Sequence, residues 1–270
     1  MPVPQTQYAR SGGVHIAYQV IGDGPRDIVL VLDWGSHLEA FWEHPLLPEF
    51  VLSLTRFARV LAFDMRGVGL SDRDIGAVPT EEWMEDVGAV MDAAGSERAT
   101  IVAHGHASQM ALLFAATHPD RVDSLVLING YARLSRAEDY PFGVPPQVAQ
   151  AMLDSVELEW GTGDSVRILG PSVAELPGVR ESWARIQRYA ASPGTAVAKM
   201  RTSLELDVRN ALPLIDVPTL VIVNRDDRLV RADHGRYLAE NVARARLFER
   251  DSADHWPWRE LAPESVSLIV

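Results

Sequence analysis

The sequence predicts an α/β protein in which a mostly parallel sheet carries helices on both faces and a helical insertion interrupts the repeat. The first observation is that short apolar runs alternate with longer helical stretches, which is the pattern of repeated strand-then-helix units. The second is that residues 131–212 break this rhythm and contain no strand-like run. With 270 residues, 47% of them hydrophobic, the chain is large enough to bury a substantial core.

The apolar runs differ in pattern, and the difference indicates their place in the sheet. Residues 14–20 alternate apolar and polar side chains, which favours a half-exposed antiparallel strand. Five other runs are apolar without alternation, as expected for strands buried on both faces of a parallel sheet; they cover residues 28–32, 60–63, 100–103, 125–128 and 220–223. The helices predicted between them cover residues 39–57, 80–94, 106–118 and 232–242.

The interrupted region predicts the domain organisation. Residues 131–212 are helical in pattern, contain several aromatic side chains and are broken by six prolines. The strand–helix pattern resumes at Pro218. We therefore expect a core formed by residues 1–130 and 213–270, with residues 131–212 forming a helical cap over one edge of the sheet.

Composition excludes several classes of function. The 25 basic and 37 acidic side chains give a formal charge of −12, which disfavours binding to nucleic acid. The absence of cysteine excludes disulfides, thiolate chemistry and zinc sites built on sulfur. The N-terminal residues do not resemble a signal peptide, and no apolar run approaches the ~20 residues of a membrane span. We expect a soluble, cytoplasmic protein with no membrane contact. Whether it forms a homo-oligomer is left open.

Polar residues follow the predicted strands, at the sheet edge where open α/β proteins bind ligands. In chain order these stretches are residues 33–37, 64–72, 104–108, 129–130, 224–228 and 254–256. Three of them form a strand-to-helix turn, a later acid and a C-terminal histidine. That order is the nucleophile, acid, histidine order of α/β-hydrolases.

The sequence resembles the α/β-hydrolase superfamily over nearly its whole length. More narrowly, it resembles the hydrolases associated with adenylate/guanylate cyclase domains in actinobacteria. The matching stretches are residues 36–39 (SHLE), 63–72 (FDMRGVGLSD), 91–99 (MDAAGSERA), 234–240 (HGRYLAE) and 254–258 (DHWPW). Within the second stretch, we expect Asp64 and Arg66 to brace the loop.

The resemblance places a glycine where the family has its nucleophile. Residues 103–107 (AHGHA) occupy the Gly-x-Ser-x-Gly turn, so the central position is Gly105. Glycine adopts positive φ at little cost, and we expect the turn to survive without its hydroxyl. A serine-centred acyl-enzyme then cannot form here, and a larger space is expected above the glycine. If the turn is intact, Gly105→Ser should create activity toward p-nitrophenyl acetate.

The other two members of the triad are present. The resemblance makes His255 the base and Asp227 the acid that orients it. Such a carboxylate holds one imidazole tautomer and stabilises the imidazolium as it forms. The alternative is that His255 is a relic kept for structure. Ser108 follows the turn, and we interpret it as a packing residue rather than a replacement hydroxyl.

The segment after residues 28–32 departs from the family. Asp33 and Trp34 stand where the resemblance expects a His-Gly or Pro-Gly oxyanion turn, so the backbone N–H groups of Trp34 and His106 are the expected oxyanion donors. Asp33 either bonds turn amides outside the pocket or acts as a catalytic acid or base. Ser36 and His37 are expected at the pocket edge, and Trp160 at the cap core or at the ligand. His104 and His106 make only a weak metal signal, so no metal or other cofactor is expected.

Three functions remain open. The first is an enzyme that lacks a covalent step, in which His255 and Asp227 act as a general base on an apolar or aromatic small molecule. Its reaction would be non-covalent hydrolysis, or a lyase, cyclisation or rearrangement step of the kind found in secondary metabolism. The second is a non-catalytic pocket that binds a small molecule. The third is an esterase whose nucleophile is displaced to Ser108 or Ser36.

Overall fold

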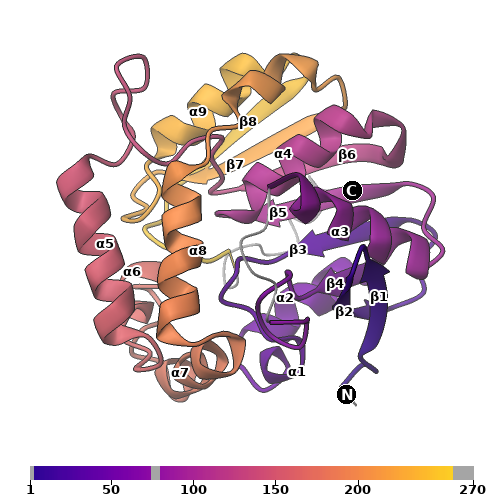
Figure 1. Cartoon of the computed structure of the whole chain (residues 1–270), viewed down its shortest axis with the longest axis horizontal. Helices are drawn as coiled ribbons and strands as arrows, with labels where there is room; N and C mark the ends of the chain where they lie inside the picture. The colour runs from indigo at the N-terminus through magenta and orange to yellow at the C-terminus, as the bar shows by residue number, and fades with distance from the viewer. Residues whose placement is uncertain (1–2, 74–79, 258–270) are drawn as a thin grey trace.

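A single eight-stranded sheet organises the computed structural model, which describes residues 3–73 and 80–257 (Figure 1). β1 and β2 run antiparallel to their neighbours, and all the other pairings are parallel. This confirms the predicted mostly parallel sheet. In spatial order the strands are β1 (Gln7–Ser11), β2 (Val14–Ile21), β4 (Arg59–Phe63), β3 (Asp27–Val31), β5 (Ala99–His104), β6 (Val122–Ile128), β7 (Thr219–Asn224) and β8 (Ala245–Arg250).

The two edge strands were not predicted, and their composition explains why. β1 and β8 lie at opposite edges of the sheet, where one side of the strand has no neighbour. β8 carries no fully buried residue, and three of the five residues of β1 are exposed. An edge strand with this little burial needs no continuous apolar run, so the pattern used to find the central strands is missing.

The central strands are buried on both faces because helices cover both. In β3, Val29 and Val31 pack into one hydrophobic cluster together with α3, α4 and α9, whereas Ile28 and Leu30 pack into the other with α1 and α2. The helices are α1 (Leu38–Phe41), α2 (Leu47–Leu54), α3 (Thr80–Ala93), α4 (Ala107–Thr117) and α9 (Ala232–Asn241). No helix in the described ranges is long and apolar enough to cross a bilayer.

The single helix predicted over residues 39–57 is wrong, because the structure contains two shorter helices there. α1 ends at Phe41 and α2 begins at Leu47. Pro45 lies in the gap and has no N–H with which to continue the hydrogen-bond ladder of α1. Pro48 occupies the first turn of α2, where a missing N–H costs nothing.

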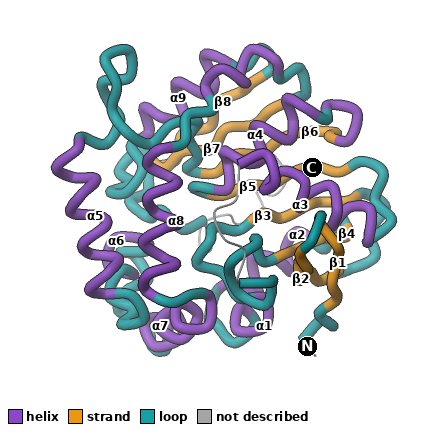
Figure 2. Tube along the Cα trace, viewed as in Figure 1, coloured by secondary structure: helices purple, strands orange, loops and turns teal. Residues whose placement is uncertain are grey.

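The helices between β6 and β7 gather at one end of the molecule. They are α5 (Pro146–Glu159), α6 (Val166–Leu169), α7 (Val179–Ala190) and α8 (Pro193–Glu205), at the left of Figure 1. Figure 2 shows helices and loops there and no strand of the sheet. Of two short 3-10 helices, Pro119–Arg121 precedes β6, and Arg209–Leu214 follows α8 and leads into β7. We refer to residues 131–212 as the cap.

The loop after β4 is braced by a buried carboxylate, as expected from its sequence. Asp64 accepts hydrogen bonds from Ser36 Oγ at 2.8 Å and from the backbone N–H groups of Leu38 at 3.1 Å and Leu70 at 2.9 Å. Gly69 has a φ of +58°, and a Cβ at this position would lie 2.1 Å from Asp64 Oδ2. Only glycine therefore allows the loop to fold around the carboxylate. This brace fixes the segment that follows β3, where part of the candidate site lies.

Arg66 anchors the same loop to α3. Its guanidinium is 3% exposed and donates to both carboxylate oxygens of Asp86 at 2.8 and 2.6 Å. Glu82 accepts a third hydrogen bond at 2.6 Å, but its side chain is 55% exposed. The same arginine thus has one buried and one solvated acidic partner.

We predict that Asp86→Asn lowers the free energy of unfolding by about 3–5 kcal/mol, because it leaves the buried guanidinium with only the solvated carboxylate of Glu82 as an acidic partner. Glu82→Gln is the matched control and should cost less than about 1 kcal/mol, because solvent screens the exposed partner. Urea unfolding followed by circular dichroism measures both. Equal losses in the two variants would contradict the role assigned to Asp86.

Candidate active site

The turn between β5 and α4 places Gly105 at the carboxyl edge of the sheet. β5 ends at His104, α4 begins at Ala107, and Gly105 has a φ of +57°. This is the strand–turn–helix geometry expected from the sequence, and it survives with glycine at its centre. An ideal Cβ at this position would lie 3.0 Å from His255 Nε2. The imidazole therefore faces the position of the absent side chain.

His255 is held by a buried carboxylate. Its Nδ1–H donates to Asp227 Oδ2 at 2.7 Å, and both side chains are almost completely buried. The other oxygen, Asp227 Oδ1, accepts the backbone N–H groups of Leu229 at 2.8 Å and Val230 at 3.1 Å. When His255 is neutral with its proton on Nδ1, Nε2 presents its lone pair toward the position above Gly105. The structure thus brings together the two residues that the resemblance paired.

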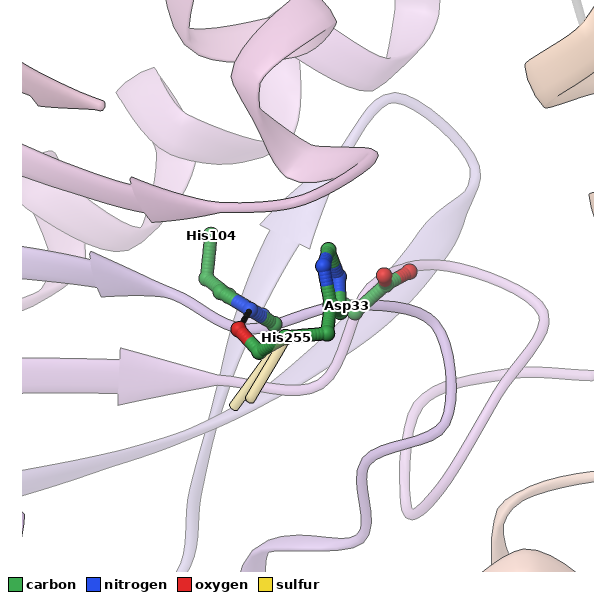
Figure 3. A group of neighbouring side chains, drawn as sticks. All are labelled: Asp33, His104 and His255. Carbon is green, nitrogen blue, oxygen red and sulfur yellow. Dashed lines mark hydrogen bonds between the residues drawn. The ribbon is translucent and has the colours of Figure 1, made fainter. Parts of the chain in front are cut away.

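The backbone of His255 is clamped by side chains that the sequence analysis did not assign. Its carbonyl oxygen accepts hydrogen bonds from Asn129 Nδ2 at 2.7 Å and from His104 Nε2 at 2.9 Å, the latter shown in Figure 3. Asn224 Nδ2 donates to the carbonyl oxygen of Asp254 at 2.5 Å. Asn129 and Asn224 each stand at or directly after a strand end. Their position at strand ends marked them as candidate site residues. The sequence could not show that they bind the backbone of a distant loop.

Asp33 occupies the group of N–H donors that we expected a substrate to use. Asp33 Oδ1 accepts the backbone N–H of Trp34 at 2.7 Å, and the backbone N–H of His106 also donates to this carboxylate. The expectation that Trp34 and His106 are open oxyanion donors is therefore wrong for this arrangement. Asp33 bonds the turn amides, as one hypothesis held, but it also lines the cavity, as the other required.

The same carboxylate fills the space above the glycine. A Cβ at position 105 would lie 2.9 Å from Asp33 Oδ2, which is closer than real Cβ atoms approach such an oxygen. The predicted enlargement of the pocket by Gly105 is therefore wrong, because Asp33 takes up that room. Figure 3 shows Asp33 and His104 on opposite sides of His255 in that view.

Burial and mutual charge set the protonation of these groups. Burial raises the pKa of Asp33 to about 6, although the charge of His255 and the two backbone N–H groups act in the opposite direction. Burial alone would lower the pKa of His255, but the carboxylates of Asp227 and Asp33 outweigh it and raise that pKa. Burial lowers the pKa of His104 well below its usual value, with the charge of His255 adding to the effect. His104 is therefore neutral.

The ring of His106 contacts Gln109, Ser203 and Trp83. Its Nδ1 lies 3.0 Å from Gln109 Oε1 and 2.5 Å from Ser203 Oγ, and its ring packs edge-on against Trp83. Burial, and to a smaller extent the charge of Lys199, lowers the pKa of His106 to about 3. Its ring is thus a neutral packing group. Ser203, on cap helix α8, lines the cavity and was not identified from the sequence.

A cavity of about 340 Å³ lies between the cap and the carboxyl ends of the strands. Trp34 stacks on Trp160 with ring centroids 5.3 Å apart, and Trp183 meets Trp256 edge-on at 4.9 Å. Trp160 therefore both packs the cap and faces the cavity. The other apolar lining residues include Phe41, Leu47, Leu134, Met152, Ile186 and Met200. Such walls suit an apolar or aromatic ligand with few polar groups.

Two residues expected at the pocket edge, His37 and Ser36, serve the scaffold, and so does Ser108. His37 caps α1, with Nδ1 accepting the N–H of Ala40 at 3.2 Å, and it does not line the cavity, so its placement at the pocket edge is wrong. Ser36 does line the cavity, but its hydroxyl donates to Asp64. Ser108 is fully buried and packs against Gly130, as its interpretation as a packing residue required.

Comparison with known proteins decides the family. The profile of the alpha/beta hydrolase fold family matches residues 34–258. This chain belongs to the alpha/beta hydrolase family. Trp258, the last residue of the match, lies outside the described residues.

Two relatives and one solved structure illustrate the family likeness. RutD of Azorhizobium caulinodans, which is provisionally named a carbamate hydrolase, is 31% identical over 251 residues, 92% of this chain and 91% of that protein. A 2-hydroxymuconate semialdehyde hydrolase of Pseudomonas sp. is 29% identical over 228 residues, covering 80% and 76% of the two chains. The enol-lactonase of Burkholderia xenovorans has the same fold, with a TM-score of 0.76 at 24% identity over 97% of this chain and 96% of that one.

Three side chains of the site are also of the types that bind metal ions. Donor atoms of Asp33, His104 and His255 lie within 4.8 Å of one another. His104 Nε2 already donates to the carbonyl oxygen of His255, and Asp33 accepts backbone N–H groups. His104 would have to leave this partner before its Nε2 could coordinate an ion.

We predict that Gly105→Ser alone does not give this protein esterase activity, because the new Cβ would lie 2.9 Å from Asp33 Oδ2. Combining it with Asp33→Gly removes the obstruction and frees the N–H groups of Trp34 and His106. The double variant should hydrolyse p-nitrophenyl acetate at least ~10²-fold faster than either single variant, the effect of a restored oxyanion donor. Equal activity of the Gly105→Ser single and double variants would show that Asp33 does not obstruct the site.

Proposed function

We propose that this protein is an alpha/beta hydrolase-family enzyme that works without a covalent acyl-enzyme, using His255 as a general base oriented by Asp227. The observation that carries the proposal is the buried 2.7 Å hydrogen bond between His255 Nδ1 and Asp227 Oδ2, with Nε2 facing the empty position at Gly105. A general base in such a position contributes ~10²–10⁴ to a rate. A buried ionic pair is costly to maintain, which favours a working role over a relic.

The occupied N–H groups favour proton transfer over acyl transfer. Ordinary ester hydrolysis builds negative charge on an oxygen beside the oxyanion donors. Here Trp34 and His106 already donate to Asp33, and an ionised Asp33 would repel that charge. Removal of a proton from an acidic C–H or O–H needs no tetrahedral oxyanion. Lyase, cyclisation or rearrangement chemistry is therefore favoured over direct hydrolysis by activated water.

The walls of the cavity define the substrate class. Four tryptophans and several aliphatic side chains surround a space of about 340 Å³, which suits a compact apolar or aromatic molecule. Relatives in the family include a 2-hydroxymuconate semialdehyde hydrolase and an enol-lactonase, whose names denote carbonyl compounds. A carbonyl compound whose reacting carbon or oxygen can lie over Gly105 is the substrate class that we propose. No cofactor is required for this chemistry.

A non-catalytic binding protein is the second candidate, and one observation favours it. The Trp34 and His106 donors are already satisfied within the protein, as they would be in a site that no longer performs acyl transfer. This hypothesis leaves the oriented lone pair of His255 without a purpose. A displaced nucleophile is the weakest candidate, because Ser108 does not reach the cavity and the hydroxyl of Ser36 is bonded to Asp64.

We predict that His255→Ala lowers turnover ~10²–10⁴-fold and that Asp227→Asn also lowers it, because the first removes the base and the second its orientation. Two probes separate the reaction classes: 3,4-dihydrocoumarin reports hydrolysis by absorbance, and 2-tetralone reports proton removal by deuterium exchange in D2O. KM should change much less than kcat.

Asp226→Asn is the matched control, because Asp226 is the exposed neighbour of Asp227 and should leave both rates unchanged. Unchanged turnover in both His255→Ala and Asp227→Asn would contradict the proposal. Binding of the probes without any turnover in the wild type would favour the non-catalytic protein. Labelling of a serine by a fluorophosphonate would instead support a displaced nucleophile.

A further inference from the structure

We propose that Asp33 is a second catalytic residue, which donates a proton to the carbonyl oxygen of an enolisable apolar ketone or aldehyde while His255 removes a proton from the adjacent carbon. The inference rests on the proposed function, since it needs His255 as the base. It adds the acid, the substrate class and a use for the glycine at position 105.

Geometry places both groups at one point of the cavity. The absent Cβ of Gly105 would lie 2.9 Å from Asp33 Oδ2 and 3.0 Å from His255 Nε2. Both residues line the cavity, and they arrive from different strand ends, β3 and the loop after β8. A substrate lying over Gly105 therefore meets a carboxyl group and an imidazole side by side. A side chain at position 105 would displace one of them.

Two N–H groups give Asp33 the means to act as an acid. As Asp33 loses its proton, negative charge appears on a carboxylate that the backbone N–H groups of Trp34 and His106 already contact. In many enzymes such N–H groups stabilise negative charge on the substrate oxygen directly. Here the N–H groups of Trp34 and His106 stabilise the negative charge on Asp33 after Asp33 has given its proton to the substrate oxygen. A protonated aspartic acid can serve a carbonyl oxygen in this manner when its surroundings are apolar.

The proposed step balances in atoms and charge. His255 Nε2 takes the proton of the α-carbon, and the C–H electron pair forms the C=C bond of the enol. The carbonyl π electrons move to oxygen, which takes the proton of Asp33. Asp33 ends as a carboxylate and His255 as an imidazolium beside Asp227. Return of a proton to the same carbon exchanges hydrogen with solvent, and return to another carbon isomerises the substrate.

The pair must hold one proton between its two members, which predicts a bell-shaped pH dependence. Burial raises the pKa of Asp33 to about 6, and the carboxylates around His255 raise its pKa above the usual value against the effect of burial. Below pH ~6 both groups are protonated and the base is lost. Above the pKa of His255 both are deprotonated and the acid is lost. Activity is therefore expected only between the two values, where the single proton lies mainly on His255 and the reactive form, with that proton on Asp33 and a neutral His255, is the minority form.

Other titratable groups that face the pair do not supply a competing acid or base. Asp227 is bonded to His255 Nδ1, and neutral His104 donates to the carbonyl oxygen of His255. Tyr131 lies near Asp33, and burial together with the charge of Asp33 raises the pKa of its hydroxyl. It stays protonated at neutral pH. Glu159, on α5, is exposed at the cavity wall.

The test is deuterium exchange at the α-carbons of 2-tetralone in D2O, measured by proton NMR between pH 5 and 9. Asp33→Asn keeps the shape of the side chain and its oxygen acceptor, so the fold should be retained. We expect a ~10²–10⁴-fold loss of exchange and disappearance of the alkaline limb, because no group that must stay protonated is then lost as the pH rises. The Asp226→Asn control should match the wild type. Exchange in the wild type no faster than in His255→Ala would overturn the inference.

A second measurement needs no substrate. Titration of 15N-labelled His255 by NMR should give a lower pKa in Asp33→Asn than in the wild type, because the negative charge of Asp33 raises it. An unchanged pKa would overturn the proposed pair. Loss of exchange in His255→Ala with full exchange in Asp33→Asn would overturn only the role of Asp33 and keep the general base. A covalent adduct on Asp33 in mass spectra would replace the acid with a carboxylate nucleophile.

Discussion

The absence of a side chain at position 105 is the constraint on which the arrangement of this site depends. Two polar groups, Asp33 Oδ2 and His255 Nε2, lie 2.9 and 3.0 Å from the place where a Cβ would be. Any residue other than glycine would push one of them aside and would also have to accept a φ of +57°. Glycine thus satisfies both the turn and the packing of two ionisable groups beside it.

The electrostatics of the site follow from that close approach. A carboxylate that is brought under the cap loses solvation, and the turn amides of Trp34 and His106 return part of it through hydrogen bonds. Burial destabilises the charged form of the His255 imidazole, and the charges of Asp227 and Asp33 stabilise it by more, so the pKa of His255 is raised. His255 and each of the two carboxylates, Asp33 and Asp227, stabilise one another's charged forms, and the position of a single proton decides which form is present. Such an arrangement needs no hydroxyl at position 105 for a proton to move.

The scaffold holds this arrangement through backbone contacts that are remote in sequence. The loop that carries His255 is clamped from the sheet by Asn129, Asn224 and His104. From the cap side, the N–H of Trp256 donates to the carbonyl oxygen of Leu169 at 2.8 Å, and Asp254 accepts from Ser172. The cap therefore touches the residues on either side of His255, so a substrate that displaces the cap would also act on the loop that carries the base.

Sequence patterns predicted the structure correctly where a segment is strongly buried and its pattern is local. The central strands and helices α3, α4 and α9 follow from apolar runs and helical periodicity, and the pairing of Asp227 with His255 follows from the family resemblance. Sequence patterns did not predict the edge strands β1 and β8, because these strands bury few residues. They also predicted one continuous helix where the structure has two, α1 and α2, on either side of Pro45. His37 was misplaced because helix capping and pocket lining demand the same kind of polar side chain after a strand.

The sequence by itself determined that position 105 lacks a nucleophile, that an acid and a histidine remain, and that the chain forms a capped α/β sheet. Only the tertiary structure decided that Asp33 accepts the N–H groups of Trp34 and His106 and fills the space above Gly105. The physical reason is that these contacts join the ends of β3 and β5 and the loop after β8. Their distances depend on how the strands align across the sheet, which no local pattern of residues encodes.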